Sequence, residues 1–300
     1  MQEAPATSKA KRWLNLALAD LGLLRRGDIS GLQTAEKLAL KIRHQKNLRK
    51  SKATQVVFLL PLVRKSHVSS WSTVEANLAN TIDCFINQTD PNWIIIICGQ
   101  DKPNLTKDDR IHFLPYKRAT TGNDKWAKLS ELVSFFPKIS QPSGYVMTFD
   151  ADDLAHRNLV QIFLSLQNPN GYLIDNGIVY DTAADTFGQA GRPTLTKPLC
   201  KPFWKLCGSC AAFRYDSNEK ILLTDFIRAT SQHEHRMFPY LASLAGRPLS
   251  VLKKNLVIYK INHGENFDPR LNKGRFKIHF VRRFPITDSN ELKEIRENFC

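Results

Sequence analysis

Two short and unbroken apolar runs constrain the fold of this chain more than any other feature. The first is TQVVFLLPLV, residues 54–63, and the second is NWIIIICG, residues 92–99. Continuous runs of this length, rich in Val, Leu or Ile, are typical of strands that are buried on both faces of a parallel sheet. The two runs therefore predict an α/β domain with its sheet in the core.

Strands and helices alternate around these runs. Capping-box spacing predicts a helix over 72–87. A short strand is expected at 111–116, an amphipathic helix at 124–136, and a further buried strand, GYVMTF, at 144–149. This order predicts a mixed, mostly parallel, Rossmann-like sheet flanked by helices. In such sheets the ligand binds beyond the carboxyl ends of the strands.

The second half of the chain is more mixed in its patterns. Strands are expected at 172–181, 203–214 and 256–261, a partly helical segment at 225–244, and a helix near 289–298. These elements would complete the sheet and cover it.

Composition divides the chain into a basic helical extension at 1–52, an α/β domain at 53–267, and a basic tail with a helix at 268–300. The extension holds 12 Lys or Arg and 4 Asp or Glu, a net charge of +8 out of +15 for the whole chain. Such a segment is either a solvated helical face or a contact for an anionic partner. Because no nucleic-acid motif accompanies the charge, a membrane surface is favoured over nucleic acid.

Residues 13–24 form an apolar-rich stretch behind three cations, which superficially resembles a signal peptide. Asn15 and Asp20 interrupt the stretch, Arg25 and Arg26 close it, and no small-residue cleavage site follows. The stretch is too short to span a membrane. We therefore expect an amphipathic helix that docks on the domain or lies on a membrane, in a cytoplasmic protein that is at most peripheral to the inner membrane.

The six cysteines include a CxxC pair, Cys207 and Cys210. A structural zinc site needs four ligands, and only Cys200 lies nearby in sequence to help. A thioredoxin-like pair should open a helix in the first βα unit, which this pair does not. Most of the cysteines are therefore expected to be core thiols that behave as small apolar side chains.

Three carboxylates, Asp150, Asp152 and Asp153, directly follow the strand at 144–149, and Asp101 lies two residues past the second apolar run. Carboxylates this close together repel one another unless a cation lies between them. Their oxygens suit Mg²⁺ or Mn²⁺, which also binds phosphates and stabilises a departing diphosphate. The alternative is an acidic surface turn, but the position at the end of a buried strand favours a metal site.

Several motifs together resemble those of inverting family-2-type glycosyltransferases, which have the GT-A fold. Asn87-Gln88-Thr89, and Asn92-Trp93 with the four isoleucines that follow, match the phrase that these enzymes carry before their second strand. The string from Phe149 to Asp153 resembles their DxD motif. The similarity covers about residues 54–267. It implies a metal-assisted enzyme of bacterial-type surface polysaccharide synthesis that moves a sugar from a UDP- or GDP-sugar to a glycan or lipid-linked acceptor.

Two segments depart from the family pattern. The second strand ends in Cys98-Gly99-Gln100-Asp101, where the family usually has Asp-Asp-Gly-Ser. The first strand runs into Pro61–Lys65, where the family usually has a small polar turn. Both departures concern the contacts with the nucleotide.

The resemblance also implies roles for individual residues. The residues expected to contact the nucleotide sugar are Pro61, Arg64, Asp101, Arg118, Lys125 and Asp150. Contacts with Mn²⁺ or Mg²⁺ fall to Asp152, Asp153 and His263. The general base that takes the proton of the acceptor hydroxyl falls to Glu234, with Asp225 as the reserve. The alternatives are an exposed loop charge for Arg118, an ordinary loop histidine for His263, and a polar helix turn for Glu234.

Two other functions compete with the transferase. A nucleotidyltransferase of the same layout would usually carry a Gly-rich phosphate loop near the first strand, and neither GxGxxG nor a P-loop occurs here. A degenerate GT-A module that only binds a glycan or a partner is compatible with the changed second-strand terminus. The intact acidic cluster argues against that alternative.

Overall fold

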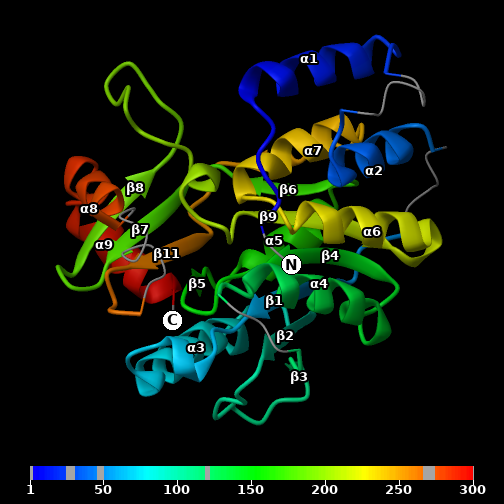
Figure 1. The fold of residues 1–300 in the computed structure, drawn as a ribbon. Coiled ribbons are helices and arrows are strands. Elements are labelled where there is room, and N and C mark those ends of the chain that lie inside the picture. Colours follow the sequence, from blue (N-terminus) through cyan, green and yellow to red (C-terminus); the bar gives the residue numbers. More distant parts are fainter. Residues whose placement is uncertain (1–2, 25–30, 46–50, 119–121, 266–273, 300) are drawn as a thin grey trace.

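The computed structural model describes residues 3–24, 31–45, 51–118, 122–265 and 274–299. Its centre is a seven-stranded sheet in the order β10-β6-β9-β4-β1-β2-β3 (Figure 1). The strands are β1 (Gln55–Pro61), β2 (Trp93–Gly99), β3 (Ile111–Pro115), β4 (Ser143–Thr148), β6 (Gly171–Ile174), β9 (Ala211–Asp216) and β10 (Ser250–Leu252).

Most neighbours in this sheet run parallel. Strand β1 pairs in parallel with β2 and β4, β2 with β3, and β10 with β6. Strand β9 is antiparallel to both β4 and β6. The predicted mixed, mostly parallel sheet flanked by helices is thereby confirmed.

The two apolar runs form the buried centre of the sheet, as predicted. Every residue of Val56–Leu60 is fully buried, and the side chains of Trp93–Cys98 are at most 6% exposed. Val56 pairs with Trp93, and Leu60 pairs with Ile97. Each large apolar side chain buried in this way contributes about 1.5–3 kcal/mol, so the two strands anchor the edge at which the predicted ligand residues lie.

The helices of the first half are α3 (Trp71–Ile86), α4 (Lys125–Phe135) and α5 (Leu159–Leu166), and α4 and α5 both pack against β1. Helix α3 begins earlier than the predicted capping box, because Ser70 is the residue that caps it. The Ser70 hydroxyl accepts a hydrogen bond from the Thr73 backbone amide at 3.2 Å.

A second, four-stranded sheet has the order β5-β11-β7-β8. Its strands are β5 (Leu154–Ala155), β7 (Gly177–Asp181), β8 (Thr186–Ala190) and β11 (Val257–Ile261). Strand β11 is antiparallel to β5 and parallel to β7. Because β5 directly follows the acidic cluster, this pairing brings the residues after β11 close to the cluster.

The strand predicted at 172–181 is wrong in one respect, because the segment forms β6 in the large sheet and β7 in the small one. The chain changes sheets at Asp175, whose side chain is 1% exposed. Its carboxylate accepts hydrogen bonds from Arg192 Nε at 2.6 Å and Trp204 Nε1 at 3.1 Å. These partners, which are remote in sequence, hold the bend, and the local sequence pattern does not predict them.

Other boundaries in the second half also differ. The predicted strand at 203–214 begins as a 3₁₀ turn, Phe203–Lys205, and becomes β9 only at Ala211. The predicted helical segment at 225–244 comprises α6 (Lys220–Thr230), a 3₁₀ turn (His235–Met237) and α7 (Phe238–Leu244). The polar turn between α6 and α7 carries Glu234, the residue to which the resemblance assigns the general base.

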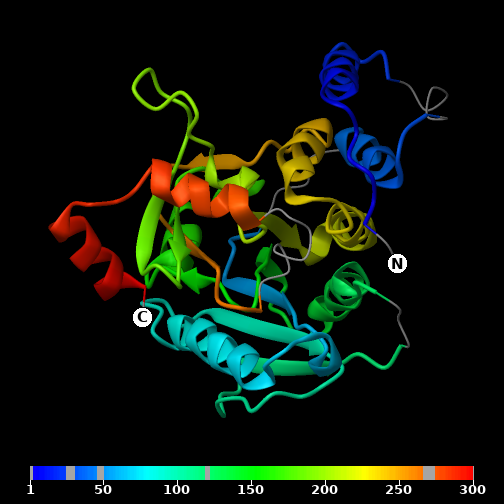
Figure 2. The ribbon, with the colours of Figure 1, turned by 60° about the vertical axis from the view of Figure 1, so that its left-hand side comes forward.

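The N-terminal helices α1 (Lys9–Asp20) and α2 (Thr34–Arg43) lie over α6 and α7 at one end of the molecule (Figures 1 and 2). Glu36 of α2 is fully buried and ties them together. Its carboxylate accepts hydrogen bonds from Thr7 Oγ1 at 2.8 Å and from Tyr240 OH at 2.7 Å. A charge buried with such partners fixes how the extension docks.

At the other end of the chain, α8 (Gly274–Arg283) packs against β7 and β8, and α9 (Ser289–Asn298) follows it. Ile295 of α9 joins Ile178, Phe187 and Ile258 in a small apolar cluster on the second sheet. Within the described ranges, none of the helices has both the length and the apolar content that crossing a membrane requires.

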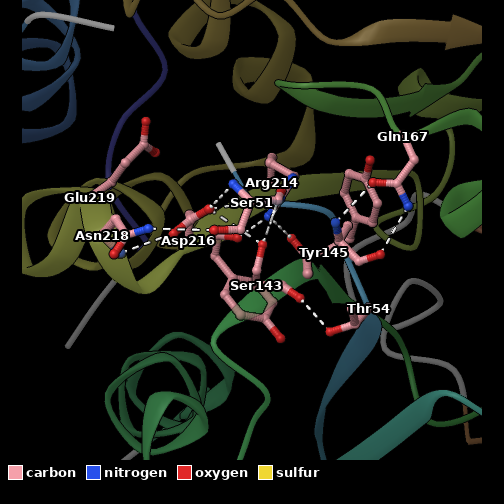
Figure 3. Close-up of polar contacts among 12 residues, drawn as sticks. Ser51, Thr54, Ser143, Tyr145, Gln167, Arg214, Asp216, Asn218 and Glu219 are labelled. Atoms are coloured by element: carbon pink, nitrogen blue, oxygen red, sulfur yellow. Dashed lines mark hydrogen bonds and ion pairs between the residues drawn. The ribbon is translucent and has the colours of Figure 1, made fainter. Parts of the chain in front are cut away.

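A buried polar network crosses the large sheet at β9 (Figure 3). Arg214 is 3% exposed and donates hydrogen bonds to the Gly144 carbonyl at 3.0 Å and to Ser143 Oγ at 2.6 Å. Asp216 lies 3.9 Å from the guanidinium and accepts from the Ser51 amide at 2.8 Å. The network ties β4, β9 and the segment before β1 together.

Candidate functional site

A cavity of about 510 Å³ opens at the carboxyl ends of β1 and β4, the edge that the sequence predicted. Its walls come from the residues after β1, the start of α4, the acidic cluster after β4, and the end of β11 with the residues beyond it. Its polar and charged lining residues are His67, Asn77, Asn123, Asp124, Lys125, Lys128, Asp150, Asp152, His235, Tyr259, His263, Glu265 and Lys277. This volume is sufficient for a small ligand.

Asp150 is the first carboxylate of the cluster and forms an ion pair with Lys125. The Lys125 Nζ atom lies 2.6 Å from Asp150 Oδ1, and both side chains are partly exposed to the cavity. Burial lowers the pKa of Lys125, but the adjacent Asp150 carboxylate outweighs burial and raises that pKa above its ordinary value. The lysine is therefore charged at neutral pH. It lines the cavity, so a bound diphosphate could contact its ammonium group beside or in place of Asp150.

Asp152 is the second carboxylate and meets His263 from beyond β11. His263 Nε2 lies 2.8 Å from Asp152 Oδ2. Burial raises the pKa of Asp152, but the hydrogen bond from His263, together with the nearby charges of Lys125 and Lys260, outweighs burial and lowers that pKa. Asp152 is thus ionised at neutral pH, with its carboxylate on the cavity wall.

The orientation of His263 follows from Asn77 of α3. Lys260 Nζ donates to Asn77 Oδ1 at 2.7 Å, so the amide nitrogen of Asn77 must face the imidazole, 3.3 Å from His263 Nδ1. An amide nitrogen can only donate, so Nδ1 accepts and the hydrogen of a neutral ring is on Nε2, facing Asp152. To ligate a metal through Nε2, the ring would have to give up that hydrogen.

Asp153, the third carboxylate, points away from the cavity and is fully buried. It accepts hydrogen bonds from Ser209 Oγ at 2.6 Å and Cys207 Sγ at 3.1 Å. Burial and the charges of Asp152 and Asp150 raise the pKa of Asp153 well above its ordinary value. Asp153 therefore holds the acidic turn against the CxxC loop, a role that the sequence analysis did not anticipate.

The loop that contacts Asp153 is the CxxC segment, residues 207–210. Cys207 and Cys210 are free and buried, and burial raises the pKa of the Cys207 thiol well above its ordinary value. Ser209 Oγ also accepts a hydrogen bond from the Asp150 backbone amide at 2.8 Å. The loop thus positions two residues of the acidic cluster from behind.

A buried ion pair forms another part of the wall. Asp124, just before α4, lies 2.8 Å from Lys128 one helical turn later. Lys128 Nζ donates to the Leu62 carbonyl at 2.6 Å, and Gln100 donates to Asp124. The pair links the ends of β1 and β2 to α4. The i, i+4 spacing of Asp124 and Lys128 was the only available sequence signal for it.

Among the residues assigned to the nucleotide sugar, Pro61, Lys125 and Asp150 line the cavity. Asp101 instead accepts a hydrogen bond from the Lys65 backbone amide at 2.8 Å. Arg118 is 75% exposed and pairs with Glu131 at 2.7 Å. The described lining does not include Arg64, Asp101 or Arg118.

The two carboxylates assigned to the general base also lie outside the described lining of the cavity. Asp225 lies on α6 and pairs with Arg228 at 3.1 Å. Glu234 precedes the 3₁₀ turn and lies 3.9 Å from Arg236. Its neighbour His235 does line the cavity.

His235 lines the cavity with a neutral imidazole ring. Its Nε2 atom is buried and has no hydrogen-bond partner among the described residues, while the ring hydrogen-bonds the backbone of Lys205. Burial, with the charges of Arg236 and Lys125, lowers the pKa of His235 to about 3. A buried acceptor without a partner is costly.

The described side chains do not form a complete metal cage. No group of three or more His, Cys, Asp or Glu in this part of the chain is arranged to hold an ion. Asp152 and His263 are the pair of predicted metal contacts that converge at the cavity. Mg²⁺ typically uses only one or two protein carboxylates and takes its remaining ligands from phosphates and water.

Comparison of the sequence with known proteins identifies no relative among those searched. Neither the protein-family models nor the curated proteins contain a match to this chain. Among solved structures, the chain is similar to the crystal structure of 4-diphosphocytidyl-2C-methyl-D-erythritol synthase. The identity is 12%, the coverage is 77% of this chain and 99% of that chain, and the TM-score is 0.30. A likeness of this degree carries no argument about activity.

Proposed function

We propose that this protein is a metal-assisted glycosyltransferase that moves a sugar from a nucleotide diphosphate sugar to a glycan or lipid-linked acceptor. The observation that carries the proposal is the convergence of two polar pairs, Asp150 with Lys125 and Asp152 with His263, on one cavity. The cavity lies beyond the carboxyl ends of parallel strands, where α/β proteins bind nucleotides. Carboxylates and cations side by side suit a ligand that carries both phosphates and a metal.

The donor set fits a hard divalent ion. Asp152 would hold Mn²⁺ or Mg²⁺, with His263 either as a second ligand after loss of its Nε2 hydrogen or as a donor to a phosphate oxygen. Such an ion would stabilise the negative charge of the departing nucleoside diphosphate. Asp153 supports the turn from behind, since its oxygens already accept from Ser209 and Cys207.

The chain's own cations would share the diphosphate. Lys125 is charged and lines the cavity, where it forms an ion pair with Asp150. Lys277 of α8 lines the same cavity. The two ammonium groups would orient the diphosphate and keep the anomeric carbon toward the acceptor, which lowers the entropic part of the barrier.

His235 would contact a hydroxyl group of one of the sugars. Its unpartnered Nε2 can accept a hydrogen bond, and its low pKa keeps it an acceptor at neutral pH. The general base that would take the proton of the acceptor hydroxyl remains assigned to Glu234, with Asp225 as the reserve. For that task the Glu234 carboxylate would have to leave Arg236 and turn into the cavity beside His235.

A nucleotidyltransferase would use the same metal and diphosphate chemistry but would transfer a nucleotide instead of a sugar. It needs a backbone cradle for a triphosphate, usually built from glycines. Here Pro61, at the end of β1, and the following Leu62 and Val63 line the cavity with apolar side chains. The sugar transferase is therefore the proposal that we carry forward.

A thermal-shift screen tests the binding half of the proposal. UDP, GDP and CDP are each added with and without Mn²⁺, to the unmodified protein and to Asp152→Asn. A ligand that binds only the folded state raises the melting temperature. We expect UDP or GDP to raise it only with Mn²⁺, and Asp152→Asn to abolish the effect. A shift that is equally large without metal, or in the variant, contradicts the assigned site.

A further inference from the structure

Helix α1 presents an apolar face to solvent. Trp13 is 73% exposed, Leu14 49%, and Leu21, at the end of the helix, 71%. These positions fall on one side of an α-helix, because residues seven or eight apart are stacked along the same face. Leu23 continues the patch and is 55% exposed.

The opposite side of α1 is the one that docks on the domain, and it is partly polar. Asn15 is 5% exposed and donates to Tyr240 OH at 2.9 Å and to Glu36 Oε1 at 3.4 Å. These buried hydrogen bonds fix the rotation of the helix. Packing of the helix on its own domain therefore does not account for the exposed Trp13, Leu14 and Leu21.

A second apolar element lies at the same end of the molecule. The loop after β8, residues 191–200, carries Leu195, which is fully exposed, and Leu199, which is 55% exposed. Figures 1 and 2 differ by a rotation about the vertical axis, which leaves heights unchanged, and in both views α1 and this loop project at the top. Both elements, which carry these exposed apolar residues, thus project at one end of the protein.

Cations cluster between these two elements. Arg12 of α1 donates a hydrogen bond to the Arg236 carbonyl at 3.4 Å, and the 3₁₀ turn Phe203–Lys205 packs against the 3₁₀ turn His235–Met237. These contacts bring Lys205 and Arg236 beside α1, which begins at Lys9, and Lys201 lies between the loop and Lys205 in the sequence. All four are exposed. The cluster also adjoins the cavity, because Leu206 and His235 line it.

We propose that this end of the molecule, with exposed Trp13, Leu14, Leu21, Leu23, Leu195 and Leu199 around the cations Lys9, Lys201, Lys205 and Arg236, docks on a lipid bilayer that carries anionic headgroups. Tryptophan and leucine insert at the boundary between headgroups and acyl chains, while lysine and arginine contact the phosphates. A second copy of the chain is the weaker occupant, since a twofold dimer would bring the cation cluster against itself.

The proposal goes beyond the transferase and does not depend on it. If the transferase proposal also holds, docking places the cavity mouth beside the membrane, where a lipid-linked acceptor would be presented. The two ideas can fail separately, because binding to vesicles is measured without any donor sugar.

Vesicle co-sedimentation of the full chain tests the docking surface. The vesicles consist of phosphatidylcholine alone or mixed with phosphatidylglycerol. The variants are Trp13→Ser with Leu14→Ser for the apolar face, and Lys201→Glu with Lys205→Glu for the cations. The matched controls are Leu166→Ser, at a leucine of α5 that is 57% exposed, and Lys293→Glu on α9, at a lysine that is 76% exposed. Circular dichroism confirms that each variant is folded.

We expect the unmodified protein and both controls to bind the anionic vesicles and to bind those of phosphatidylcholine more weakly. Each double variant should lose at least about tenfold in binding, since two inserted side chains or two charges contribute more than one tenfold step. Added salt should weaken binding. The proposal is overturned if the unmodified protein does not sediment with anionic vesicles, or if the variants bind as well as the controls. It is also overturned if light scattering shows a dimer that Trp13→Ser with Leu14→Ser dissociates.

Discussion

His263 Nε2 lies 2.8 Å from Asp152 Oδ2, although 111 residues separate them in the sequence. The contact exists because β11 pairs with β5, the strand that directly follows the acidic cluster. Asn77 and Lys260 then fix the imidazole on its other side. The candidate metal site is therefore assembled by the second sheet as much as by the first.

Asn77→Leu should disturb this site without unfolding the protein. The substitution removes the group that holds His263 Nδ1 and leaves Lys260 without its acceptor at Asn77. We expect the midpoint Mn²⁺ concentration for nucleotide binding to rise by about tenfold, as is typical when a residue that orients a metal ligand is lost. Titration with Mn²⁺ at fixed nucleotide measures this. Asn80→Leu on the same helix is the control, and an equal shift in both variants would contradict the orienting role.

Asp153→Ala should act on stability before activity. It removes the acceptor of two buried donors, Ser209 Oγ and Cys207 Sγ, and leaves a small void. Leaving buried polar groups unpaired costs about 1–3 kcal/mol, so urea denaturation should show a loss of that order. Asp152→Ala, on the cavity wall, should cost less in unfolding free energy and more in metal-dependent binding. The reverse order of the two variants would contradict the separate roles of these carboxylates.

The stability of the protein should fall between pH 6.5 and pH 5, in part because of His235. Its pKa is lowered to about 3 in the folded state, so the unfolded chain binds the proton more readily in this interval. Stability from a neutral histidine is present above the unfolded pKa and is lost as the pH falls. We expect a loss of about 1–2 kcal/mol from this residue between pH 7 and pH 5. Denaturation of His235→Gln at both pH values should show a smaller loss, and an unchanged loss would contradict the assignment.

Arg214→Ala should be among the most destabilising single changes. It leaves Asp216 buried without its guanidinium neighbour and removes donors to Gly144 and Ser143. Breaking a buried charged pair from one side costs about 3–5 kcal/mol. Arg118→Ala, at an exposed ion pair with Glu131, is the control and should cost under about 1 kcal/mol. Similar unfolding free energies for the two variants would contradict the structural role of the network.

The sheet was predictable because the sequences of its central strands are themselves diagnostic of buried strands. Val56–Leu60 and Trp93–Cys98 are apolar throughout, and only a doubly covered strand buries such a run completely. The bend at Asp175 was not predictable, since the partners that hold it, Arg192 and Trp204, are remote in sequence.

The site was predictable only in outline. The acidic cluster lies on the expected edge, but nothing local distinguishes Asp152, which faces the cavity, from Asp153, which is buried. That difference is set by Ser209, 56 residues along the chain from Asp153. The resemblance led to the expectation of His263 at a metal site, and the structure places its ring beside Asp152. The place of His235 in the cavity lining was not predictable, because the direction of a side chain in an irregular turn depends on packing that the sequence does not display.

The most direct test of the proposed activity is the release of nucleoside diphosphate from a panel of UDP- and GDP-sugars, measured with Mn²⁺ and with a chelator. The proposal predicts that at least one donor releases UDP or GDP with Mn²⁺, by slow hydrolysis or by transfer to an added glycan or lipid-linked acceptor. Release should cease with the chelator and in Asp152→Asn. If the unmodified protein neither binds nor cleaves any of these donors with Mn²⁺ present, the glycosyltransferase proposal is contradicted.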